Sequence, residues 1–362
     1  MSKTLFLYIS RRILVWFFGF LAVAAMVVLL LEVLELVRRA ASRADVGLGT
    51  IVQMALLHLP HIIDIALPFA MLFAALAALS QLSRHHELAV ARAAGLSIWQ
   101  LLLPGLAVAF LIGVLKVVAF NPLVAVSLTM FEDFEAVYFD KKSSNTVFQE
   151  SGLWLKDYSE RYNFIVHANK LVPGSRYLEE VTVFEMSDDG KFEKRIDAAR
   201  GVLKNGVWAF DDVSTVGPAQ AAVQQPHLEL PTRLTWLKLE DSFASPASMP
   251  VWRLPAFIRL LEDAGFSAAA HRVQLHIALA APMAMVSMVL IAAGFAIRPP
   301  RRGGVLLLMT MAAIAGLGFH LLTQVFFRLG LSGQLPAALS AWAPVAFVTM
   351  LGAAWLLYTE DG

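Results

Sequence analysis

The chain has 362 residues, of which 58% are hydrophobic and 16% charged, and its formal net charge is +1. This composition and a mean hydropathy of +0.65 exclude an ordinary soluble protein and indicate an integral membrane protein. There is no cysteine, which excludes disulfides, thiolate metal sites and cysteine nucleophiles and leaves the redox compartment open.

The net charge is distributed unevenly along the chain. Residues 121–270 hold roughly 15 basic and 21 acidic side chains, a balance of about −6, which leaves about +7 for the remainder. We therefore predict three segments: membrane spans in 1–120, a soluble insert in 121–270, and further spans in 271–362.

The N-terminal segment contains three long apolar runs. The first, residues 13–36, is long enough to cross a bilayer with some tilt and too long for the core of a signal peptide. The others cover residues 51–82, broken by Pro60 and Pro68, and residues 101–120. Three spans are therefore expected before the insert.

Residues 83–100 form a polar interruption between the second and third runs, and they include Arg84, His86, Glu87 and Arg92. Good helix formers from 85 to 94 predict a short helix on the membrane surface. Its small alanines would let another protein approach Glu87, which favours a docking helix. The alternative is a solvated turn in which Glu87 pairs with Arg84.

The insert has a β pattern. Short apolar and aromatic stretches alternate with turn signals, and Asn205-Gly206 is a strong hairpin signal. A sandwich, jelly roll or open barrel of roughly 110 residues is expected, followed by an amphipathic helix at 251–264. The predicted strands lie at 145–148, 152–155, 163–167, 180–185 and 202–210, with further turns at Pro173-Gly174 and Asp188-Asp189-Gly190.

Three further spans are expected at 271–297, 305–327 and 335–358. The positive-inside rule then favours cytoplasmic N- and C-termini, an extracytoplasmic insert and a cytoplasmic 83–100. The cytoplasmic connections would carry Lys3, Arg11, Arg12, Arg84, Arg92, Arg298, Arg301 and Arg302, against Arg38, Arg39, Arg43 and Arg328 on the other side.

Motifs for nucleotide binding, serine hydrolysis and zinc proteolysis are absent from the sequence, so the energy for any energised work comes from elsewhere. The polar residues inside the spans are the informative set, because ionisable groups in a membrane are costly and mark functional cavities. They are Glu32 and Glu35 in the first span, His58, His61 and Asp64 in the second, and His320, Gln324 and Arg328 in the fifth.

In the predicted topology these groups lie in the outer half of the bilayer, above apolar inner halves. That asymmetry suits an amphiphile with a charged head and acyl tails better than an ion, so a lipid substrate is predicted. Arg38, Arg39 and Arg328 are candidates for anionic head groups. Glu32, Glu35, His61, Asp64, His320 and Gln324 are candidates for lining the cavity.

Plainer interpretations stay open for each group. Glu35 can pair with Arg38 and Arg39, which can also snorkel to the interface as the end of a span. His58, His61 and Asp64 could be metal ligands, but Pro60 should disrupt the helix between them, so no metal site is expected.

In this arrangement of spans, insert and cytoplasmic helix, the chain resembles the YjgP/YjgQ (LptF/LptG) permeases of the lipopolysaccharide export ABC transporter. The resemblance rests on residues 68–97, on SGLWLKD at 151–157 and on residues 280–304. Residues 151–157 and the C-terminal third look more like the LptG branch than the LptF branch. The implied fold has six transmembrane helices, three on each side of a jelly-roll-like extracytoplasmic domain.

The resemblance also implies a function and a set of partners. It implies a non-catalytic permease subunit that extracts lipopolysaccharide from the inner membrane as one half of a permease heterodimer. A cytoplasmic ATPase dimer would hold ATP and Mg, a single-span protein would join the periplasmic bridge, and this chain would need no cofactor and bind no nucleic acid. The rival interpretations are the paralogous subunit, an ATPase-independent lipid carrier and a structural scaffold.

Individual residues match the family pattern unevenly. The family's coupling glutamate matches Glu87, so the resemblance implies a coupling helix at about 84–95 with Arg84, His86 and Arg92 beside it. Basic residues that contact substrate match Arg38 and Arg39. A further family lysine falls at Glu32, a departure that implies a lipid with fewer or differently placed phosphates.

Overall fold

The structure is a computed structural model whose chain divides into two units. The first consists of Met1–Glu132, Pro246–Pro255 and Ala269–Gly362, and the second of Asp133–Ser245 and Ala256–Ala268. The structure describes residues 3–41, 47–139, 153–158, 163–171, 177–186, 192–204, 206–217, 222–232, 245–263, 268–297 and 304–361. The predictions for Arg43, residues 145–148, Pro173-Gly174, Asp188-Asp189-Gly190, Asn205, Arg298, Arg301 and Arg302 lie outside these residues.

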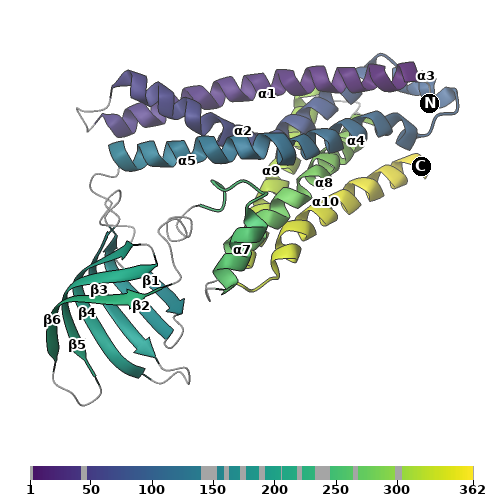
Figure 1. Ribbon diagram of the computed structural model, residues 1–362. Coiled ribbons are helices and arrows are strands. Elements are labelled where there is room, and N and C mark those ends of the chain that lie inside the picture. The colour runs from purple at the N-terminus through teal and green to yellow at the C-terminus, as the bar shows by residue number, and fades with distance from the viewer. Residues whose placement is uncertain are drawn as a thin grey trace. The chain divides into compact units, whose positions relative to one another are not determined.

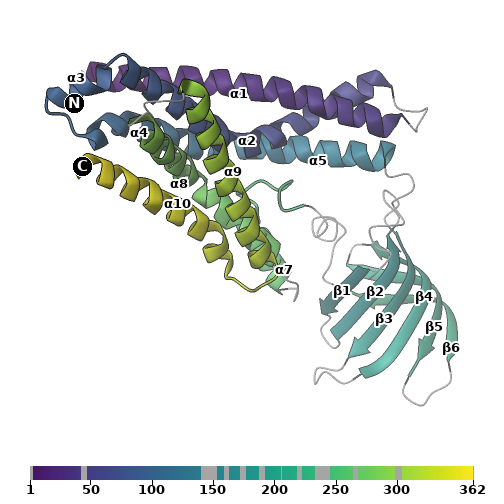
Figure 2. The ribbon, with the colours of Figure 1, turned by 180° about the vertical axis from the view of Figure 1, so that it is seen from behind.

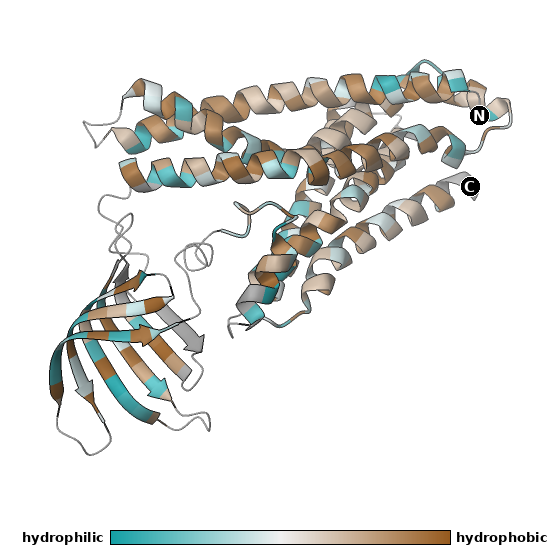
Figure 3. Cartoon of the chain, in the orientation of Figure 1, coloured by the Kyte–Doolittle hydropathy of each residue, from teal (hydrophilic) through white to brown (hydrophobic). Residues whose placement is uncertain are grey.

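Among the described residues, six helices are long and apolar enough to cross a membrane, as predicted (Figure 1). Hydrophobic colours dominate them in Figure 3. The spans are α1 (Lys3–Ala40), α2 (Leu48–Arg84), the continuous α4 (Ile98–Leu115), η1 (Lys116–Phe120) and α5 (Asn121–Tyr138), then α8 (Ala269–Ile297), α9 (Gly304–Leu331) and α10 (Ala337–Asp361).

Two helices run further than the sequence pattern predicted. The second span is one unbroken helix although it contains Pro60 and Pro68, because packing against neighbouring helices compensates for the lost backbone hydrogen bonds. The third span does not end at residue 120. A π-helical turn, Lys116–Phe120, lies directly before Asn121 and Pro122, and the chain continues through it into α5. The insert therefore begins beyond residue 121.

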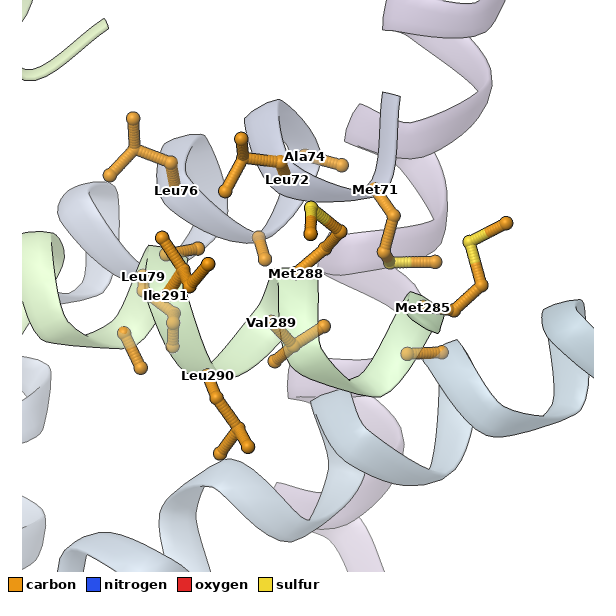
Figure 4. Close-up of a cluster of buried hydrophobic side chains, with 14 of the residues drawn as sticks. Met71, Leu72, Ala74, Leu76, Leu79, Met285, Met288, Val289, Leu290 and Ile291 are labelled. Atoms are coloured by element: carbon orange, nitrogen blue, oxygen red, sulfur yellow. The ribbon is translucent and has the colours of Figure 1, made fainter. Parts of the chain in front are cut away.

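The core of this unit lies where α2 crosses α8. Met71 and Leu72 pack among Met285, Met288 and Val289, all buried (Figure 4). On the other side of α8, α4 approaches so closely that a Cβ on Gly113 would overlap the Cα of Pro282. Small residues thus allow backbone-to-backbone packing, which is how helices associate in a membrane.

The second unit contains one antiparallel sheet whose order, β1 to β6, follows the sequence (Figure 2). The described strands therefore form an antiparallel meander, which confirms the β-rich insert that was predicted. Buried apolar residues such as Val183, Ile196 and Phe210 line one face. The strands are Leu153–Tyr158, Asn163–Leu171, Tyr177–Met186, Phe192–Lys204, Val207–Val216 and Val223–Pro231.

The predicted hairpin at Asn205-Gly206 is confirmed, because Lys204 pairs with Val207 and Gly206 has φ +82. Strand β6 was not predicted. Its sequence VQQPHLELP is polar and contains Pro226, a combination tolerated at the edge of a sheet.

After the sheet, Pro246–Pro255 belongs again to the first unit and is hydrogen-bonded to α5. The backbone N–H of Val251 donates to Asn121 Oδ1 at 2.8 Å, and Thr129 Oγ1 donates to the carbonyl of Ser248 at 3.3 Å. Helix α7 (Leu254–Asp263) follows, which confirms the amphipathic helix predicted there.

Candidate functional site: a polar cavity, a basic helix end and a short surface helix

A cavity of about 270 Å³ opens among α2, α8, α9 and α10 of the first unit. Most of its wall is apolar, including Phe69, Phe319 and Phe327. Polar side chains from three spans and η1 also line it: His61, Asp64, Lys116, Gln274, His320 and Gln324. Such a lining accommodates an amphiphile, because it offers both hydrocarbon contact and hydrogen bonds.

The charges in the cavity wall are paired with each other. Lys116 Nζ lies 3.1 Å from Asp64 Oδ2 and donates to the backbone carbonyl of Asp64 at 2.9 Å. The two side chains are 17% and 25% exposed. Because the pair is neutral as a whole, the cavity presents hydrogen-bonding groups without a strong net charge.

The structure separates the predicted cavity-lining residues into two groups. His61, Asp64, His320 and Gln324 meet in the cavity. Glu32 instead joins α1 to α2, with its Oε1 2.8 Å from His58 Nδ1. His58 also stacks on Phe131 of α5 at 4.2 Å between ring centroids. This cluster therefore connects α1, α2 and α5.

The end of α1 carries the predicted head-group residues. Arg38 makes two hydrogen bonds of 2.8 Å to Glu35, and Arg39 Nε lies 4.0 Å from the same carboxylate. The local pairing considered as an alternative is therefore confirmed. The Arg38 side chain is nevertheless 77% exposed, so it can also bind an anion. Arg328 is exposed on α9.

The polar stretch after α2 folds as predicted into a short helix, α3 (Glu87–Ala93). Arg84, His86 and Arg92 are exposed on it or beside it, and Glu87 is half-buried. Gly95 ends the helix at φ +86. The next helix starts with a capping box in which Ser97 Oγ accepts from the Gln100 N–H and the Gln100 side chain accepts from the Ser97 N–H.

Glu87 pairs with α1 and not with Arg84. Its Oε1 accepts from Arg12 Nη1 at 3.2 Å and from the Tyr8 hydroxyl at 3.3 Å. Arg12 Nε donates to Gln81 Oε1 at 3.2 Å. The alternative interpretation paired Glu87 with Arg84, three residues back, but α1 brings a guanidinium from 75 residues away.

No cluster of three metal-ligating side chains occurs in the described part of the chain. His58 and His61 lie on one helix with their rings 5.6 Å apart, so the predicted disruption of the helix at Pro60 is wrong.

Sequence reasoning did not assign a role to Arg12, Lys116 or Gln274. Arg12 was counted only as part of a basic anchor, although it recurs at a spacing of four with Tyr8 and Trp16 and so shares a helix face with them. That spacing was the available signal. Nothing in the spacing of Lys116 and Gln274 connects them with Asp64, because they come from different helices.

The chain was compared with known proteins. The model of the family described as "Lipopolysaccharide export system permease LptF/LptG" matches residues 7–359. Two curated relatives are the lipopolysaccharide export system permease proteins LptG of Escherichia coli strains K12 and O6:H1. Each is 23% identical over 314 residues, which cover 84% of this chain and 84% of the relative.

Proposed function

The chain belongs to the LptF/LptG family of lipopolysaccharide export permeases and is a multi-pass protein of the inner membrane, and from this premise we propose its role. It is the LptG-type permease half of an ABC transporter that extracts lipopolysaccharide from the inner membrane and passes it to a periplasmic bridge. The observation that carries the proposal is the family match from residue 7 to 359.

Two regions of the membrane unit fit the two ends of an amphiphile: the basic end of α1 and the largely apolar cavity. Arg38 and Arg39 attract the anionic head group, while the apolar walls of the cavity accommodate hydrocarbon. Glu32, paired with His58, stands where the family has a lysine, so the head group is held with less positive charge at this point.

The proposal places ATP hydrolysis on a separate cytoplasmic ATPase dimer, which holds ATP and Mg. The sequence has no P-loop, and Arg84, His86 and Arg92 are exposed on or beside the short α3, where a partner can contact them around Glu87. The N- and C-termini are then cytoplasmic, and the sheet is periplasmic.

Two further partners follow from the same assignment. A paralogous permease subunit completes the heterodimer, and a single-span protein joins the periplasmic bridge. The choice of LptG over LptF is supported by the two E. coli relatives, which are both LptG proteins.

The test replaces Glu87 by Ala and by Arg in the complete complex, with His85→Ala, an exposed neighbour, as the matched control. Copurification of the ATPase subunit and release of lipopolysaccharide from proteoliposomes are measured. We expect both Glu87 variants to lose release, with assembly weakened or hydrolysis uncoupled. Normal assembly and release in both would move the coupling site away from α3. Release by the wild-type chain without any ATPase would indicate an independent lipid carrier.

A further inference from the structure

The two adjacent arginines of α1 have different environments. Arg11 is exposed, as expected of a basic residue that anchors a helix at the membrane interface. The Arg12 side chain is only 17% exposed and has three hydrogen-bond partners. An interfacial anchor does not need such partners, so Arg12 requires another explanation.

Arg12 links three helices through one planar group. Its Nη1 donates to Glu87 of α3 at 3.2 Å and to the Tyr8 hydroxyl at 2.7 Å, and its Nε donates to Gln81 of α2 at 3.2 Å. Trp16 Nε1 donates to the same Gln81 oxygen at 3.3 Å. A guanidinium holds two acceptors in fixed relative directions, which a lysine cannot do.

Helix α3 has seven residues, and none of them is fully buried. Leu88 packs partly buried against the core of the membrane unit, and Glu87 makes the charged link to Arg12 of α1. The directional link through Arg12 therefore supplements a small apolar contact. The charged link ends on α1, the helix that carries Arg38 and Arg39 at its other end.

We propose that Arg12 is a positioning residue that transmits movement of α3 to α1 by holding Glu87 and Gln81 together. This inference rests on the proposed function, since it takes α3 as the contact with the ATPase. It assigns to Arg12 a role in coupling and not in docking or membrane anchoring.

The first experiment compares Arg12→Gln with the matched Arg11→Gln, which removes the same charge one residue away, and with Arg12→Lys. ATPase copurification, hydrolysis and lipopolysaccharide release are measured in the full complex. We expect Arg12→Gln to keep its ATPase but to release about tenfold less lipid per ATP, the size expected for loss of charged hydrogen bonds. Arg12→Lys should restore part of the loss, and Arg11→Gln should behave as wild type.

A second measurement separates this inference from the proposed function. Because the chain has no cysteine, spin labels can be placed at Leu7→Cys on α1 and Val90→Cys on α3, both exposed positions. The distance distribution between the labels should broaden in Arg12→Gln and stay narrow in Arg11→Gln.

An unchanged distance distribution, normal release per ATP, or loss of the ATPase itself in Arg12→Gln overturns the inference. If the wild-type complex hydrolyses ATP but moves no lipopolysaccharide, the proposed function fails, and the label distances still decide whether Arg12 links α3 to α1.

Discussion

Lys116 and Asp64 form an ion pair between the third and second spans, with Nζ 3.1 Å from Oδ2. Lys116 is the first residue of the π-helical turn that joins α4 to α5. The widened turn and the ion pair thus occur at one point, beside the cavity. Such turns are frequent at functional sites.

Replacing Lys116 by Met should leave the Asp64 carboxylate half-buried without a counter-charge. We expect a loss of about 2 to 4 kcal/mol of stability, less than for a fully buried pair because both side chains retain some exposure. Thermal unfolding of the purified protein, followed by tryptophan fluorescence, measures it. The double variant Asp64→Asn with Lys116→Met should recover part of the loss. Equal losses in the single and double variants would contradict the pairing.

Gly113→Ala should destabilise the membrane unit, because its new Cβ would overlap the backbone of Pro282 and force α4 and α8 apart. We expect a cost of about 1 to 3 kcal/mol, typical of overpacking. Gly19→Ala is the matched control, since nothing lies within 4 Å of that position and alanine favours a helix. The two unfolding midpoints should therefore move in opposite directions.

Glu32→Gln should weaken the contact between α1 and α2 by removing the charge that pairs with His58. A hydrogen bond to a charged group contributes about 1.5 to 3 kcal/mol, so a measurable drop in unfolding temperature is expected. Glu35→Gln makes the same change on the same helix, but its partners are exposed arginines. Its effect should be smaller than that of Glu32→Gln, because solvent screens the exposed pair. The prediction fails if Glu35→Gln proves the more damaging.

The edge strand β6 should be more stable at acidic than at alkaline pH. The hydrogen bond from His227 to Asp211, and to a smaller extent the one to Glu229, raises the pKa of the His227 imidazole above its ordinary value of 6.5. A raised pKa in the folded state stabilises the fold below pH 6.5, and this contribution is lost as the pH rises through the folded value.

Hydrogen exchange of β6, corrected for the intrinsic rate, measures this effect in the full chain. Wild type should show greater protection at pH 5.5 than at pH 8.5. His227→Asn should abolish the difference, because asparagine does not titrate. A difference of the same size in both proteins would assign the effect to other groups.

The sequence predicted the elements whose pattern is local. Long apolar runs gave the six spans, and Asn205-Gly206 gave the hairpin between β4 and β5. The helix ends were less accurate, since Pro60 and Pro68 were taken as breaks in the second run, although α2 continues through both. The third run was ended at residue 120, although a π-helical turn there leads on into α5. Strand β6 was missed because a polar edge strand lacks the alternation that marks a half-buried one.

The roles of the candidate site residues stay predictions, and only their positions can be compared with the structure. Spacing on a single helix correctly put His320 and Gln324 together. It could not indicate that Glu32 faces His58 or that Glu87 faces Arg12, because both contacts join different helices. Pairing across helices depends on packing angles and register, which a single sequence does not encode locally.

Helix α1 has 38 residues, contains no proline and runs without interruption from Lys3 to Ala40. At 1.5 Å per residue it is about 57 Å long, nearly twice the hydrocarbon thickness of a bilayer. Arg12 and Arg38 are therefore about 39 Å apart along one rod. A tilt or axial shift imposed at the Arg12 end reaches the arginines at the far end through the stiffness of the backbone itself, without a relay of side chains across the membrane.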